Sequence, residues 1–76
     1  MSHEERIALD PALLSGKPVV RGTRLSVEHV IGLLADGWSV ADIADQYPGV
    51  TDADVLACLA YAREVLASER VYPTAA

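Results

Sequence analysis

The sequence predicts a mainly α-helical fold, a three-helix bundle of the helix-turn-helix type preceded by a short two-stranded β-ribbon. Three stretches with apolar residues at helical spacing occupy residues 26–68, and each begins at a capping residue. Ahead of them, proline and glycine separate two short β-branched segments. Short turns join the helices, of which the second is short and the third long, and these are the proportions of a helix-turn-helix module.

The predicted ribbon pairs residues 6–9 with residues 18–22. The first segment, RIAL, ends at Asp10-Pro11, a dipeptide that marks a turn. The second, PVVRG, has two valines at its centre, and its leading proline indicates an edge strand because proline cannot donate to a strand ladder. Residues 12–16 are expected to form a helical turn that ends at a glycine, which tolerates a left-handed backbone. The two strands pair either within one chain or between two.

The first two helices have clear start and stop residues. Ser26 is a good N-cap for a helix that ends at Gly37, and Ser39 caps a second helix that stops at Pro48-Gly49. Asp42 stands three residues after the second cap, which resembles a capping box with the shorter acid. The buried faces are expected at Val27, Val30, Ile31 and Leu34 in the first helix and at Val40, Ile43, Ala44 and Tyr47 in the second.

The third helix is predicted to start after Thr51, with Asp54 in the capping-box position, and to extend to about Ser68. Its segment VLACLAYA (55–62) carries no charge, and a helix without a polar face is buried on more than one side. The small chain covers one side, so we expect a homodimer with this helix at its centre. The predicted interface consists of Val55, Leu59, Ala62 and Leu66. The alternative is that the alanines make this stretch look more apolar than it is.

Length and composition indicate one small domain, residues 1–68, followed by a short C-terminal tail, residues 69–76. The tail is either a frayed end or a segment that folds on a partner, with Val71 and Tyr72 as anchors. No apolar run reaches the roughly 18 residues of a membrane span, and the N-terminus lacks the apolar core of a signal peptide. We therefore expect no membrane association and a cytoplasmic location.

Charge is distributed unevenly along the chain. The net charge of −5 has the wrong sign for a protein held on nucleic acid by its overall field. Residues 15–27 nonetheless carry Lys17, Arg21 and Arg24 and no acid, whereas residues 36–54 carry aspartates and no base.

Two interpretations of these cations stay open. Lys17, Arg21 and Arg24 of two subunits would together hold a few DNA phosphates. Alternatively, the two arginines pair with aspartates of the second and third helices. The third helix is poorly suited to enter the major groove, because its first turn carries Asp52 and Asp54 where phosphates would lie.

The sequence indicates neither an enzyme nor a bound cofactor or metal. GKP (16–18) is not a Walker loop, which needs an earlier glycine and a hydroxyl residue directly after the lysine. The two histidines and the single cysteine match no zinc-ligand spacing, and no histidine has the neighbours of an activated nucleophile. We expect His29 to be a partly exposed structural residue and Cys58 to be a small core residue.

One order of residues extends over most of the chain. It runs through Ile7, Asp10-Pro11, GKPVVRGTR (16–24), Leu34, Ile43, Tyr47-Pro48, Val55 and Ala60-Tyr61-Ala62. This order resembles a small bacterial family, the domain-of-unknown-function family four hundred and thirty-three (DUF433), from about residue 5 to residue 66, and the GKPVVRGTR core is quite specific. The resemblance implies a homeodomain-like three-helix fold preceded by a β-ribbon, a dimer, and no catalytic residues.

Members of that family resemble antitoxins of type II toxin–antitoxin pairs, which are often encoded beside a small PIN-like nuclease. By this analogy the chain would mask a nuclease toxin and, together with it, bind its own promoter DNA. Only a short segment follows the third helix, so neutralisation would use the globular surface or the VYPTAA end. The alternative function is a protein-interaction or structural dimer that does not bind DNA, which the negative net charge favours.

Overall fold

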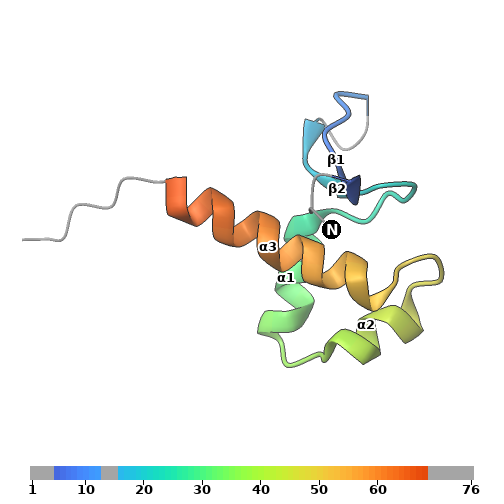
Figure 1. Ribbon diagram of the computed structural model, residues 1–76. Helices are drawn as coiled ribbons and strands as arrows, with labels where there is room; N and C mark the ends of the chain where they lie inside the picture. Colours follow the sequence, from blue (N-terminus) through green and yellow to red (C-terminus); the bar gives the residue numbers. More distant parts are fainter. Residues whose placement is uncertain (1–4, 13–15, 69–76) are drawn as a thin grey trace, which may run out of the picture.

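The computed structural model describes residues 5–12 and 16–68 and contains a small antiparallel sheet followed by three helices (Figure 1). The elements are β1 (Ile7–Ala8), β2 (Val19–Val20), α1 (Val27–Ala35), α2 (Val40–Gln46) and α3 (Asp52–Ser68). This order confirms the predicted mainly α-helical fold with an N-terminal ribbon. None of the helices in the described residues is long and apolar enough to cross a membrane.

The ribbon forms within one chain. Ile7 pairs with Val20 and Ala8 with Val19 in an antiparallel register. Both valines of β2 are fully buried, so the ribbon turns its β-branched side chains into the protein. The backbone N–H of Val27 donates to the carbonyl oxygen of Pro18 at 2.9 Å, which joins the ribbon directly to the first turn of α1.

The three predicted N-caps are confirmed. The hydroxyl of Ser26 accepts a hydrogen bond from the backbone N–H three residues later. Ser39 and Asp42 exchange side-chain to backbone hydrogen bonds of 2.9 and 3.0 Å, which makes a capping box with aspartate in place of glutamate. Thr51 and Asp54 exchange the same pair of bonds at 2.9 and 3.2 Å. Each helix start therefore satisfies backbone donors that would otherwise lack a partner.

A second regularity supports the same helix starts. An apolar residue precedes each cap, and another follows it four positions later, the arrangement of a hydrophobic staple. The pairs are Leu25 and Val30 for α1, Trp38 and Ile43 for α2, and Val50 and Val55 for α3. All six belong to the hydrophobic core or pack against it, so the entry direction of every helix is tied to the core.

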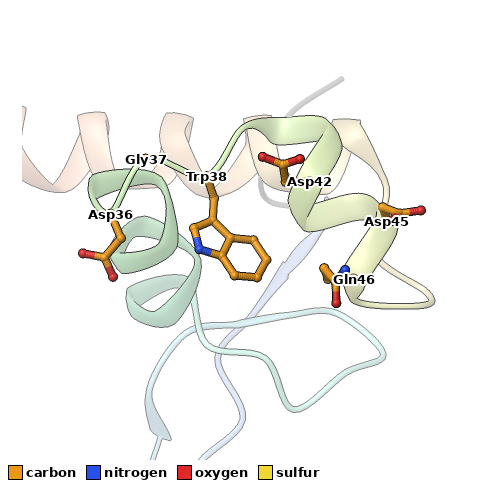
Figure 2. A pocket seen from close by; sticks show the side chains of 6 residues that line it. All are labelled: Asp36, Gly37, Trp38, Asp42, Asp45 and Gln46. Atoms are coloured by element: carbon orange, nitrogen blue, oxygen red, sulfur yellow. The ribbon is translucent and has the colours of Figure 1, made fainter.

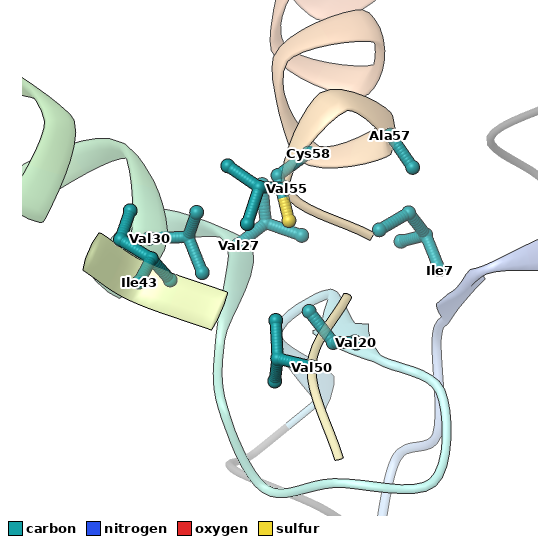
Figure 3. Close-up of a cluster of buried hydrophobic side chains, with 9 residues drawn as sticks. All are labelled: Ile7, Val20, Val27, Val30, Ile43, Val50, Val55, Ala57 and Cys58. Carbon is teal, nitrogen blue, oxygen red and sulfur yellow. The ribbon is translucent and has the colours of Figure 1, made fainter. Parts of the chain in front are cut away.

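The core lies between the ribbon, α1, α2 and the first half of α3 (Figure 3). Its buried members are Ile7, Val20, Val27, Val30, Ile43, Val50, Val55, Ala57 and Cys58. The second half of α3 extends beyond this cluster and past α1 (Figure 1). The fold thus covers only part of its longest helix.

One ion pair connects the ribbon to α3. Arg6 Nη1 donates to Asp54 Oδ1 at 3.0 Å, and the two side chains are 27% and 12% exposed. Partial burial on its own raises the pKa of Asp54, but the hydrogen bonds from the Thr51 backbone N–H and from Arg6 outweigh it and hold the pKa below its ordinary value. The same carboxylate therefore caps α3 and fixes the strand that packs against it.

Candidate functional site

The turn that follows β2 is held by several hydrogen bonds around Thr23. Its backbone N–H and its hydroxyl both donate to the carbonyl oxygen of Val20, at 3.0 and 2.8 Å. The same hydroxyl accepts from the backbone N–H of Leu25 at 3.0 Å. Gly22 has a φ of 83°, a left-handed conformation that glycine adopts without strain. The RGTR segment is therefore a well-defined turn.

The structure gives the three predicted DNA-contacting cations different surroundings. Lys17 Nζ lies 3.0 Å from a carboxylate oxygen of Glu28, and both side chains are exposed. Arg21 donates to the carbonyl oxygens of Glu5 and Ile7 at 2.9 and 3.3 Å, so its guanidinium binds the backbone beside β1. Arg24 is exposed and makes no hydrogen bond or ion pair with residues 5–12 or 16–68. Among these three cations, Arg24 is thus the one without a hydrogen-bond or ion-pair partner in residues 5–12 or 16–68.

A second candidate surface lies between the C-terminal end of α1 and α2. A hollow of about 290 Å³ is lined by Asp36, Gly37, Trp38, Asp42, Asp45 and Gln46. The Trp38 ring lies between the two helices, with Asp36 on one side of it and the other two carboxylates on the opposite side (Figure 2). This acidic hollow combines a partly exposed aromatic ring with three carboxylates, which suits a cationic group of a partner.

The end of α1 creates the acidic hollow. Gly37 adopts a φ of 99° just after the helix, its N–H donates to Leu34, and the N–H of Trp38 donates to Leu33 at 3.0 Å. These two bonds form a Schellman motif, which turns the chain sharply and fixes where Trp38 stands. We did not identify Trp38 as a site residue from the sequence.

The carboxylates of the acidic hollow differ in their structural role. Asp42 completes the cap of α2, and the backbone and hydroxyl hydrogen bonds of Ser39 lower its pKa. Asp36 is the C-cap of α1 and Asp45 lies in the last turn of α2. An acid at a helix C-terminus opposes the helix dipole, and neither of these last turns contains a base that would offset it. We did not predict this surface from the sequence, although acids at the expected ends of two helices were a signal for it.

The exposed side of α3 differs by one position from the predicted dimer interface. Leu59 and Leu66 are 40% and 65% exposed, and Ala62 is half-buried. Val55, by contrast, is fully buried in the core of its own chain, whereas its neighbour Leu56 is 55% exposed. The apolar surface that α3 leaves open therefore runs through Leu56 rather than Val55.

Other residues considered in the sequence have structural surroundings. Burial raises the pKa of the Cys58 thiol to about 11, and the nearby charge of Asp54 adds to this effect. The thiol is therefore protonated and unreactive near neutral pH. His29 is exposed, and its Nε2 lies 3.2 Å from the hydroxyl of Tyr47. The predicted tail anchors Val71 and Tyr72 lie outside the described residues.

Comparison with known proteins places the chain in a family. The family model described as a protein of unknown function, DUF433, matches residues 7–62. The crystal structure of a DUF433 member protein from Anabaena variabilis is similar, with 25% sequence identity and a TM-score of 0.74. That match covers 78% of this chain and 58% of the other, so this chain spans less than two thirds of that relative.

No curated protein matches the sequence. The family match extends from β1 through most of α3, and the solved relative shares the fold. Both agree with the resemblance drawn from the GKPVVRGTR segment and the residues around it. The chain therefore belongs to the DUF433 family.

Proposed function

We propose that this protein is a dimeric, antitoxin-like binding protein that pairs with a small PIN-like nuclease and masks it. The acidic hollow is the surface that contacts the nuclease, and α3 joins the two copies of the chain. The kind of partner follows from the resemblance of DUF433 members to antitoxins encoded beside such nucleases. The surface follows from the charges and the aromatic ring between α1 and α2.

The observation that supports this proposal most is the position of Asp36 and Asp45. Both acids stand at helix C-termini, where the helix dipole disfavours negative charge. Residues that oppose local stability are expected at functional sites rather than at structural ones. A nuclease binds a polyanionic substrate, and a basic substrate-binding surface on it would be complementary to this acidic surface. Trp38 adds an aromatic face for a cationic side chain, and tryptophan is enriched among residues that dominate binding energy.

The test is capture of the partner from the native host. The tagged full chain is recovered from nuclease-treated extract, and the bound proteins are identified by mass spectrometry. We expect a small nuclease in stoichiometric amount with the wild-type chain and its loss with the double variant Asp36→Asn/Asp45→Asn. The matched control, Asp10→Asn/Asp52→Asn, removes the same charge from exposed positions outside the acidic hollow and should retain the nuclease. A wild-type chain that captures no nuclease contradicts the proposal.

Promoter binding is a second candidate function, and the exposed Arg24 favours it. If the RGTR turn of each subunit contacts DNA phosphates, Arg24→Ala weakens binding to all sequences by a similar factor and reduces the slope of log K against log salt by about one per subunit. The measurement is a titration of promoter DNA at several salt concentrations. A wild-type chain that does not bind DNA, alone or with its nuclease, leaves the alternative of a protein-interaction dimer.

A further inference from the structure

The exposed apolar surface of this protein is concentrated on one helix. Within the described residues, the large hydrophobic side chains that are exposed are Leu9 and four on α3, namely Leu56, Leu59, Val65 and Leu66. Three of these four side chains are more than 40% exposed, and Leu66 is the most exposed of them, at 65%. Leu56 and Leu59 stand in the same turns as the core residues Ala57 and Cys58. Val65 and Leu66 lie in the second half of α3, which extends past the core (Figure 1). An uncovered apolar helix face of this kind marks an interaction site.

Three of the four exposed apolar residues of α3, Leu56, Leu59 and Leu66, share one stripe, whereas Val65 lies on another face of the helix. Leu56, Leu59, Arg63 and Leu66 are separated by three, four and three positions, which is the a/d spacing of a coiled coil. Most positions that flank this stripe are alanines: Ala53, Ala60 and Ala67 on one side, and Ala62 on the other side next to the buried Val55. Small flanking side chains let a second helix approach closely, so the α3 stripe fits a helix better than a flat surface.

The α3 stripe is complementary to itself when reversed. Its spacing of three, four and three is the same in both directions, so a second copy in antiparallel orientation meets it at every level. A two-fold axis at the level of Tyr61 then gives every contact twice, because a residue of one chain that meets a position of the partner has its own position met by the same partner residue. In a parallel pair in register, Arg63 would instead face the same cation of the partner, and like charges at such a position are unfavourable.

We propose that two copies of this chain associate through antiparallel α3 helices, with Leu56 against the partner subunit's Leu66 and Leu59 against the partner subunit's Arg63. This arrangement rests on the dimer that is part of the proposed function and specifies its geometry. The two chains each carry a net charge of −5, yet residues 55–62 carry no charge, so the pairing buries no carboxylate in its central part. The acids of the hollow lie between α1 and α2 and stay accessible.

Disulfide cross-linking tests the orientation. The full chain with Leu56→Cys and Leu66→Cys is oxidised with copper phenanthroline and separated on a non-reducing gel. We expect rapid formation of covalent dimers by the double variant and little by either single variant, because each new cysteine faces the other position across the axis. Both substituted positions are exposed, so the core is unchanged, and the wild-type Cys58 is fully buried. Leu9→Cys, at an exposed position outside α3, measures cross-linking by random collision.

Charge substitution provides a second test of the antiparallel arrangement. Leu59→Glu sets a carboxylate opposite the partner subunit's Arg63 and should leave the dimer dissociation constant within about tenfold of the wild-type value. Leu66→Glu sets a carboxylate opposite the partner subunit's Leu56 and should raise that constant by well over tenfold. Sedimentation equilibrium measures both. An equal loss of association in the two variants contradicts the antiparallel register.

The remaining outcomes separate this inference from the proposed function. Single variants that cross-link as well as the double variant indicate a parallel pair and overturn the inference. A dimer that none of the α3 cysteines cross-links uses another surface and also overturns it, while capture of the nuclease is unaffected. A monomer whose capture of the nuclease depends on Leu66 shows that the partner, rather than a second copy, covers α3.

Discussion

Asp54 connects the start of α3 to the ribbon through one carboxylate. It accepts from the N–H of Thr51 at the start of α3 and from Arg6 beside β1. Asp54→Ala leaves the Thr51 donor and the Arg6 charge without this partner, and we expect it to lower the free energy of unfolding by about 1–3 kcal/mol. Urea denaturation measures the change. Asp52→Ala, in the same helical turn but exposed, should change it by less than about 0.5 kcal/mol.

The low pKa of Asp54 makes the fold sensitive to acid. Because the pKa is below 3.8 in the folded chain, the unfolded chain binds more protons as the pH falls through that value. The stability that this carboxylate contributes is fully present about one pH unit above 3.8 and is lost as the pH falls toward the folded-state pKa. Asp54→Asn should therefore flatten the fall in unfolding free energy below this pH. A pH series of urea denaturation curves with an unchanged acid slope would contradict this assignment.

Arg21 and Arg24 are predicted to have different effects when each is replaced by alanine. Arg21 holds two backbone carbonyl oxygens beside β1, so Arg21→Ala should lower the unfolding free energy by about 1 kcal/mol. Arg24 makes no such contact with the described residues, so Arg24→Ala should leave stability unchanged. Thermal unfolding followed by circular dichroism compares the two. Equal melting temperatures for both variants would contradict a structural role of Arg21.

Residue contacts were predictable where they are local. Ser26, Ser39 and Thr51 identify their own helix starts because a cap acts within one turn. The contact between Arg6 and Asp54 joins residues 48 positions apart and depends on how β1 packs against α3. The sequence suggested that Arg21 and Arg24 pair with aspartates of the second and third helices, whereas the ion pair described here joins Arg6 to Asp54.

The C-terminal ends of α1 and α2 yield a prediction about their acids. Asp36→Asn/Asp45→Asn removes two charges that oppose the helix dipoles. The free energy of unfolding of the variant should therefore equal that of the wild type or exceed it by roughly a few tenths of a kcal/mol. Chemical denaturation checks this in the absence of any partner. A clear loss of stability would mean that these acids serve the fold, and the argument for the acidic hollow as a binding surface would fail.

The direction in which α3 faces was only partly predictable. The charge-free segment 55–62 indicated that the helix is apolar on more than one side, but it contains no polar residue that marks which side meets the core. Val50 and the buried Ala57 and Cys58 fix that side in the structure. Val55 is consequently buried in the core of its own chain, and Leu56 is the residue that α3 exposes to solvent.

The three candidate surfaces point in different directions from the core. The RGTR turn lies on the ribbon, the acidic hollow lies between α1 and α2, and the uncovered half of α3 extends away from both (Figure 1). One chain thus has room to bind a second copy, a basic protein and a polyanion at separate places. The fold class followed from capping residues and helical spacing. The acidic hollow did not, because it depends on the turn that places Trp38 between two helices.

The central claim about assembly is that the chain associates with itself through α3. Light scattering during size-exclusion chromatography of the full chain, at micromolar concentration and without a partner, tests it most directly. We expect a mass close to twice that of one 8.1 kDa chain, and a lower mass for Leu66→Glu under the same conditions. A wild-type mass that stays near 8.1 kDa would contradict it.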